Sequence, residues 1–171
     1  MIRKIILLGL MVLCAMALSA QVGLFNLEYA MPLAQADSLL INQGFMADGQ
    51  ADGLVRYKQS ENEYVSALIL FVEPTTERIV GWFVKYNAAN SEENDDFVLR
   101  HLQELHGETN VYDEETQQLI WFLSTTRNVF VVYSEYNELT VLYYDSHFPE
   151  IFKLNKDKQP VQDFPDPALE E

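Results

Sequence analysis

The spacing of apolar residues along the chain changes twice from a helical period to a strand period. In the segment PLAQADSLLINQ, which begins at Pro32, apolar side chains recur every three or four residues, and Gly44 follows. Proline is favoured in the first turn of a helix and glycine just after its end, so this segment is predicted to be helical. A second segment, DDFVLRHLQEL, has the same period, follows the capping and acidic residues 90–93, and is closed by Gly107. It is predicted to be the second helix.

Each predicted helix is followed by short apolar runs that are typical of β-strands. The predicted strands span residues 54–58, 64–72, 78–86, 118–123, 129–135 and 139–144. Short turns join consecutive strands, so neighbouring strands must run antiparallel. The predicted fold class is therefore α+β: two tandem α-β-β-β units, at about residues 31–87 and 91–146, form one antiparallel sheet of about six strands with both helices on one face. The other face is expected to be partly open to solvent or to a partner.

The two ends of the chain differ from this pattern. Residues 1–20, MIRKIILLGLMVLCAMALSA, combine a basic start, an apolar run and small residues before the expected cleavage point, which is typical of a secretory signal peptide. The apolar run is shorter than the ~20 residues that a membrane span needs. We therefore predict a single domain over residues 21–153, a periplasmic or secreted location in a bacterium, and no membrane span after cleavage. Residues 154–171 hold three prolines among charged side chains and are predicted to be a loosely held tail.

Charge narrows the classes of partner. The chain has 11 basic and 26 acidic side chains, a formal net charge of −15. Cleavage after Ala20 would remove Arg3, Lys4 and the only cysteine, leaving 151 residues with a net charge of −17 and no possible disulfide. Nucleic acids are bound by basic clusters, so they are not expected as partners. Another envelope or secreted protein is possible as a partner, and the oligomeric state stays open.

Three segments carry a family resemblance: AMPLAQADSLLINQGF, VLRHLQELHGETNVY and LIWFLSTTRNVFVVYSEYNELTVLYYD. They include a helix that ends in Gly44-Phe45, a strand with Trp121, and the closing triplet Tyr143-Tyr144-Asp145. The sequence resembles small secreted proteins of Bacteroidetes-type bacteria, mostly uncharacterised. Their tandem helix-plus-sheet units are similar to those of beta-lactamase inhibitor protein and of a small outer-membrane-assembly lipoprotein. The resemblance implies a binding or scaffold role and supplies no catalytic residue.

The stretch DGQADG resembles the start of a calcium loop, which needs oxygen ligands at positions 1, 3 and 5, glycine at 6 and a glutamate at 12. Asp48, Gln50, Asp52 and Gly53 fit the first part, but position 12 is Gln59 and a strand-like segment follows where a helix should begin. We interpret the stretch as a turn that leads from the first helix into a strand. No metal site and no cofactor are predicted.

Histidines are the next candidate ligands. His101 and His106 are five residues apart on the second predicted helix and so do not share a face. His101 and Glu104 do share one, but such a pair is typical of a solvated helix surface. His106 is expected to be a cation stabilised by the helix end.

Two sequence features resemble catalytic sites, a triad-like triplet and clusters of acidic residues, and neither fits the chemistry well. Asp145-Ser146-His147 has the residue types of a catalytic triad, but triad members converge through space and not along the chain. The acidic clusters at residues 92–96 and 113–115 fall in loops or at a helix start, whereas a paired carboxylic acid for glycoside cleavage needs an apolar pocket. No catalytic residue is predicted.

Aromatic residues are the richest feature of the predicted strands. Tyrosine and tryptophan are common anchors of binding interfaces. The predicted contacts on the exposed sheet face are Trp82, Tyr86, Tyr133 and Tyr143. The function expected from the sequence is that of a secreted, non-enzymatic binding or scaffold protein. The alternative is an envelope hydrolase or carbohydrate-active enzyme that uses acidic residues.

Overall fold

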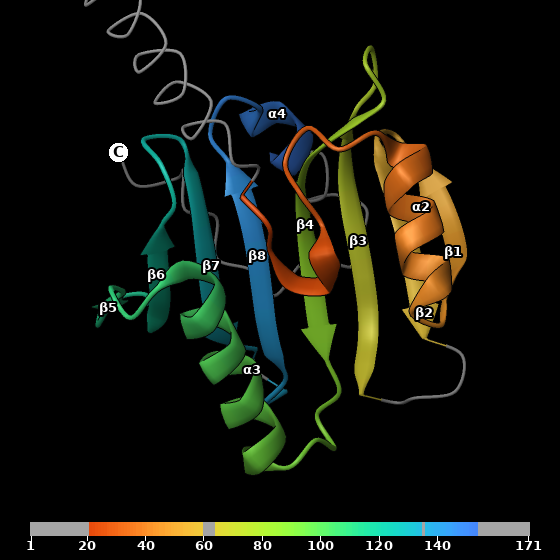
Figure 1. Cartoon of the computed structure of the whole chain (residues 1–171). Coiled ribbons are helices and arrows are strands. Elements are labelled where there is room, and N and C mark those ends of the chain that lie inside the picture. Colours follow the sequence, from red (N-terminus) through yellow and green to blue (C-terminus); the bar gives the residue numbers. More distant parts are fainter. Residues whose placement is uncertain (1–20, 60–63, 135, 154–171) are drawn as a thin grey trace, which may run out of the picture.

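The computed structural model describes residues 21–59, 64–134 and 136–153, and within these ranges the fold is α+β (Figure 1). The predicted signal peptide and the predicted tail lie outside the described residues. The elements are η1 (Leu24–Asn26), α2 (Leu33–Asn42), β1 (Phe45–Ala51), β2 (Leu54–Gln59), β3 (Val65–Glu73), β4 (Arg78–Tyr86), α3 (Glu92–His106), β5 (Val111–Asp113), β6 (Gln118–Phe122), β7 (Arg127–Tyr133), β8 (Leu139–Asp145) and α4 (Pro149–Lys153). Within the described ranges, no helix has both the length and the apolar character needed to cross a membrane.

All strands belong to one antiparallel sheet in the order β1-β2-β3-β4-β8-β7-β6-β5. The antiparallel sheet is as predicted, but it has eight strands and not about six. The two additional strands, β1 and β5, lie at its opposite edges. Both are mostly exposed, so their sequences lack the apolar alternation by which the other strands could be recognised.

The stretch DGQADG forms most of β1 and the hairpin turn after it, which corrects the predicted helix-to-strand turn. Asp52 and Gly53 both have positive φ, 47° and 79°, which is the conformation of the tight two-residue turns favoured in hairpins. The Asp48 carboxylate lies 2.7 Å from Lys58 Nζ and 3.6 Å from Arg56 Nε on the neighbouring strand.

Helices α2 and α3 and the short η1 lie on the same side of the sheet (Figure 1). Their buried side chains, among them Ala36 and Leu40 from α2 and Val98 and Leu102 from α3, form the main core with one face of the sheet. We call this side the helix face. The prediction that both helices pack on one face is confirmed.

The opposite sheet face, called here the second face, carries a separate apolar cluster. Its buried members are Ile69, Phe71, Val80, Phe83, Phe130, Leu142 and Tyr144. α4 packs against one end of this cluster through Phe152, whose ring centroid lies 4.5 Å from that of Phe71 and 4.6 Å from that of Tyr144. The face is thus buried over the central strands and exposed near its β6 edge, where Phe122 is 64% exposed.

A bulge at the start of β4 explains how Val80 joins the second face. Phe71 pairs with Gly81, but the next residue, Val72, pairs with Ile79, so Val80 is the extra residue. Simple alternation would place Val80 and Trp82 on one face. Instead Ile79 and Trp82 belong to the main core, and Val80 points the other way.

Candidate binding cleft

The predicted contact residues are placed differently from the expectation. Trp82, Tyr86 and Tyr143 are at most 3% exposed and belong to the core under the helices, whereas Tyr133 is 47% exposed. The expectation that all four lie on an exposed sheet face is therefore wrong for the first three. Tyr133 lies beside α3, where its hydroxyl donates to Asp95 Oδ2 at 2.9 Å. Burial and this bond raise the pKa of Tyr133 to about 12.

Trp82 and Tyr143 are structural. They are paired across β4 and β8, and their rings stack with centroids 4.0 Å apart. Gly23 crosses above them so closely that a Cβ there would come within 2.5 Å of both rings. The Tyr143 hydroxyl accepts from the Leu24 amide at 3.1 Å and lies 2.8 Å from His106 Nε2. These contacts attach the chain before α2 to the core of the sheet.

His106 is not the helix-end cation that the sequence suggests. Burial lowers its pKa to about 4, with a smaller contribution from His101, so desolvation outweighs the favourable helix end. The neutral ring can accept the Tyr143 hydroxyl proton at Nε2. His101 instead lies at the surface, with Nδ1 3.4 Å from Glu104 Oε2.

A cleft of about 590 Å³ opens at one end of the sheet, between the segment before α2, the start of β4, the turn after β8, and α4. We call it the Arg127 cleft. Its polar lining includes Tyr29, Arg78, Arg127, Asp145 and His147. Its apolar lining includes Ile79, Val80, Phe148 and Ile151.

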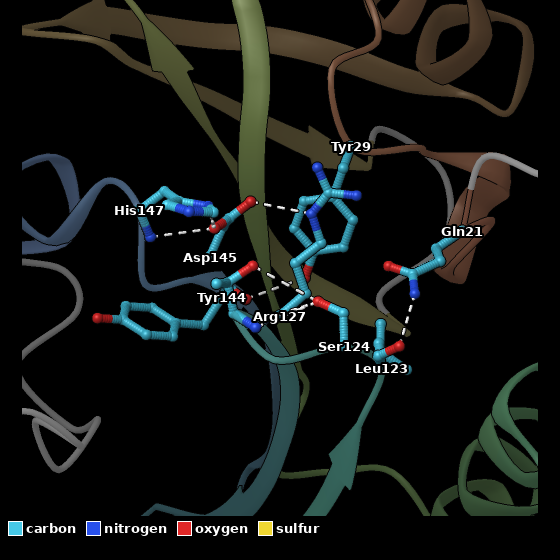
Figure 2. Close-up of polar contacts among 9 residues, drawn as sticks. Gln21, Tyr29, Leu123, Ser124, Arg127, Tyr144, Asp145 and His147 are labelled. Carbon is cyan, nitrogen blue, oxygen red and sulfur yellow. Dashed lines mark hydrogen bonds and ion pairs between the residues drawn. The ribbon is translucent and has the colours of Figure 1, made fainter. Parts of the chain in front are cut away.

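The cleft is organised by an ion pair between the first residue of β7 and the last residue of β8. Arg127 and Asp145 are opposite each other in the sheet, and Arg127 Nε donates to Asp145 Oδ2 at 2.9 Å (Figure 2). The Asp145 side chain is only 3% exposed, whereas that of Arg127 is 34% exposed. The His147 amide donates to the second carboxylate oxygen at 3.1 Å, so Asp145 has charge-assisted bonds on both oxygens.

A turn before β7 holds the backbone at Arg127 in place. Ser124 Oγ accepts from the amides of Thr126 and Arg127 at 3.2 and 3.1 Å. The Ser146 amide donates to the Thr126 carbonyl at 2.8 Å, which ties this turn to the one after β8. On the same side, Gln21 Nε2 donates to the Leu123 carbonyl at 2.7 Å (Figure 2).

The guanidinium of Arg127 lies over the ring of Tyr29, with Cζ 4.5 Å from the ring centroid. Burial raises the pKa of the Tyr29 phenol, which therefore stays neutral and donates to the Tyr144 carbonyl at 3.2 Å. Arg78 Nη1 donates to the carbonyl of Ala30, the residue after Tyr29, at 2.5 Å. Two guanidiniums thus contact one dipeptide, Tyr29-Ala30. They are two of the four arginines in the described part of an acidic chain.

Glu73, one of the carboxylates that line the cleft, is hydrogen-bonded within the turn that follows it. It accepts from the Thr75 amide at 3.0 Å and from the Thr76 amide at 2.7 Å. Hydrogen bonds from Thr76 and Thr75 lower the pKa of Glu73 to about 2. That shift is opposite to the one a general acid needs.

The Asp145-Ser146-His147 triplet forms a strand end and a turn, as predicted. His147 Nδ1 lies 3.3 Å from Asp145 Oδ1, and the imidazole is 69% exposed. Within the described ranges, no hydroxyl is hydrogen-bonded to this imidazole, so the relay from nucleophile to base that a triad needs is not formed there. The described residues also contain no group of three or more histidine, cysteine or acidic side chains arranged to hold a metal ion.

From the sequence, Asp145 and His147 were considered only as members of a triad and were interpreted as a strand end and turn, and Tyr29, Arg78 and Arg127 were missed. One usable signal was present, because Arg127 is a basic residue at the start of an apolar strand in a strongly acidic chain. Its partner could not be inferred, since the pairing depends on the register of β7 against β8.

Comparison with known proteins finds no match among protein-family models, curated proteins or solved structures.

Proposed function

We propose that the protein is a secreted or periplasmic, non-enzymatic binding protein that holds a carboxylate-bearing ligand in the Arg127 cleft. The observation that carries this proposal is the buried carboxylate of Asp145, which fixes the Arg127 guanidinium against the Tyr29 ring. Withdrawing a carboxylate from water is costly, and a buried ion pair is often no more stabilising than an apolar pair. The pair does, however, hold the Arg127 guanidinium in a fixed orientation at the cleft wall, where a ligand can bind it.

The chemistry of the ligand follows from the lining. Arginine has five N–H donors in a planar fork, and within the described ranges the side-chain bond of Arg127 uses only Nε. The two terminal nitrogens can bind a carboxylate in two parallel bonds. Arg78, bound to the Ala30 carbonyl, adds a second positive charge to the cleft lining. The apolar wall of Ile79, Val80, Phe148 and Ile151 suits an aliphatic or aromatic body attached to that carboxylate.

The cleft replaces the sheet face as the proposed binding surface. The sheet-face hypothesis depends on exposed aromatic rings, and Trp82, Tyr86 and Tyr143 are buried. Glu73 does not suit the alternative, an enzymatic function, because a general acid needs a raised pKa and the pKa of Glu73 is lowered to about 2.

Calorimetry with a simple probe tests the proposal. Residues 21–171 are titrated with 4-phenylbutyrate, and 4-phenylbutanamide serves as the neutral probe of the same shape. We expect the carboxylate to bind, and the amide to bind about 10- to 100-fold more weakly, because charge-assisted hydrogen bonds are worth about 1.5–3 kcal/mol. Equal heats from both probes, or no heat from either, would contradict the proposal.

Variants separate a binding defect from a folding defect. Arg78 is an exposed residue at the start of β4, so Arg78→Gln should weaken 4-phenylbutyrate binding without loss of the fold. Arg100→Gln is the matched control, because Arg100 is exposed on α3 and does not line the cleft. The proposal fails if Arg78→Gln and Arg100→Gln bind the probe alike.

We also infer that residues 1–20 are a signal peptide and that the mature protein lies in the periplasm or outside the cell. The basic start, apolar run and small residues of this segment support the inference. N-terminal sequencing of the protein recovered from its native cells should begin at Gln21. A sequence that begins at Met1 or Ile2 would contradict it.

We further propose that the chain consists of two tandem units, each a helix followed by antiparallel strands. The order of elements supports this, since α2 precedes β1 to β4 and α3 precedes β5 to β8. The last strands of the two units, β4 and β8, meet at the centre of the sheet. Superposition of the Cα atoms of residues 33–86 on those of residues 92–145 tests the idea, and a match no better than between unrelated helix–sheet segments would reject it.

A further inference from the structure

The second face of the sheet carries a continuous apolar row. The register pairs Ile69 with Phe83, Phe83 with Leu142, Leu142 with Phe130, and Phe130 with Ile120. The row thus crosses five adjacent strands, β3, β4, β8, β7 and β6. Its first four side chains are at most 5% exposed.

Among the described residues, Phe152 of α4 contacts Phe71 and Tyr144, which lie beside this row and are not part of it. The apolar side chains from outside the sheet that pack on the second-face cluster are Phe148, Ile151 and Phe152. α4 has five residues and is therefore about 7.5 Å long, whereas five strands span about 19 Å. Side chains on an open sheet face keep part of their surface in contact with water. The low exposure of the row therefore requires a further covering layer.

We propose that residues 154–171 of the same chain form this layer by lying across the second face. These 18 residues follow α4 directly, and α4 already lies on that face. An extended chain of this length reaches about 60 Å, well beyond the width of the row. The proposal revises the expectation of a loosely held tail, which was based on composition alone, and it is independent of the proposed ligand cleft.

The composition of the segment suits this position. Its larger apolar side chains are Leu154, Val161, Phe164 and Leu169. Its three prolines favour an extended backbone and reduce the number of amide donors that packing on side chains would leave unpaired. Its last nine residues contain four acidic and no basic side chains. β2 and β4 carry Arg56, Lys58 and Lys85 next to the row. Asp48 lies near the first two and Glu138 pairs with Lys85, so three cations face two carboxylates there.

Nuclear Overhauser contacts in the full mature chain, residues 21–171, test the proposal directly. We expect contacts between the Val161 methyls or the Phe164 ring and the side chains of Ile69, Leu142 and Phe130. Leu40 and Leu102, in the core on the helix face, should show none. A sample that mixes isotope-labelled and unlabelled chains distinguishes contacts within one chain from contacts between copies. Contacts that are absent, or that arise only between copies, would overturn the proposal, and the second case would make another copy the covering layer.

Truncation after Lys153 gives an independent readout. The truncated chain should bind the apolar dye 8-anilinonaphthalene-1-sulfonate with several-fold higher fluorescence than the full mature chain, and a synthetic peptide of residues 154–171 should reverse the increase. A peptide in which Val161 and Phe164 are both alanine is the control and should not reverse it. Equal dye fluorescence of the truncated and full chains would overturn the proposal.

Discussion

Arg127 and Asp145 form an ion pair in which the carboxylate is buried and the guanidinium is partly exposed. Removal of the guanidinium alone leaves a carboxylate inside the protein without its cation. The backbone bond from His147 would remain, but it compensates only part of that charge. Removal of Arg127 is therefore expected to destabilise the protein more than removal of Asp145, because only the carboxylate is buried.

Arg127→Gln is expected to lower the free energy of unfolding by about 2–3 kcal/mol, measured by urea denaturation. The double variant Arg127→Gln/Asp145→Asn should lose less than the sum of the two single variants, because the stranded charge is also removed. Additive losses would show that the two side chains are not coupled.

His106 gives the protein a pH-dependent stability. Its pKa in the folded state, about 4, lies below its ordinary value near 6.5, so the unfolded chain binds the proton more tightly. The contribution of neutral His106 is fully present above about pH 6.5 and is lost as the pH falls to about 4. We expect a loss on the order of 2 kcal/mol, reduced from the full shift because the ring is only partly buried.

The pH dependence is measured as the difference between wild type and His106→Gln in urea unfolding at pH 4 and pH 6.5. Carboxylates titrate in both proteins and cancel in this difference. A difference that does not change with pH would refute the assignment.

At the element scale, β4 contributes side chains to the apolar clusters of both sheet faces. Gly81 faces α4, and a Cβ there would collide with the Tyr143 carbonyl oxygen and come within 2.7 Å of the Phe152 ring. A carbonyl oxygen of β8 cannot move without breaking the pairing of β4 with β8. The close approach of the strands and the seating of α4 therefore depend on the absence of a side chain at this position.

Gly81→Ala is expected to lower the free energy of unfolding by about 3 kcal/mol through overpacking. In the background of Phe152→Ala the same substitution should cost less, because one of the two obstacles is gone. Thermal denaturation of the wild type, the two single variants and the double variant measures this coupling. An unchanged melting temperature for Gly81→Ala would contradict the packing described here.

The elements that could be predicted from the sequence are those with a buried stripe. The helix around Val98 and Leu102 has a clear apolar period and residues 78–86 form a nearly continuous apolar run, and the structure has a helix and a strand there as predicted. β1 and β5 have none, since most of their side chains face water. The bulge at Val80 depends on the pairing of Val72 with Ile79 and of Phe71 with Gly81, which apolar spacing alone does not predict.

The faces of the strands were the harder prediction. Alternation separates Trp82 from Phe83, but it cannot tell which of two apolar faces the helices will cover. The aromatic side was assumed to be open, and Trp82 and Tyr143 proved to be its buried centre. The candidate cleft is formed by residues far apart in sequence, and no local pattern brings Tyr29 to Arg127.

At the scale of the whole molecule, the strongly apolar sheet buries side chains on both faces, and the cleft lies at one end of it. The strands β4, β7 and β8 and the adjoining turns hold its arginines in place. Binding sites built on rigid elements keep their donors in position, which reduces the ordering that a ligand must impose. We propose that this end of the sheet binds a carboxylate through Arg127.

The most direct test is the side-chain Nε–H resonance of Arg127 in a ¹⁵N-labelled sample of residues 21–171 titrated with 4-phenylbutyrate. We expect this resonance to shift in a saturable way, 4-phenylbutanamide to produce no such shift, and the Arg100 resonance to stay in place. A saturable shift of Arg100 together with an unmoved Arg127, or no shift of either resonance, would contradict carboxylate binding at Arg127.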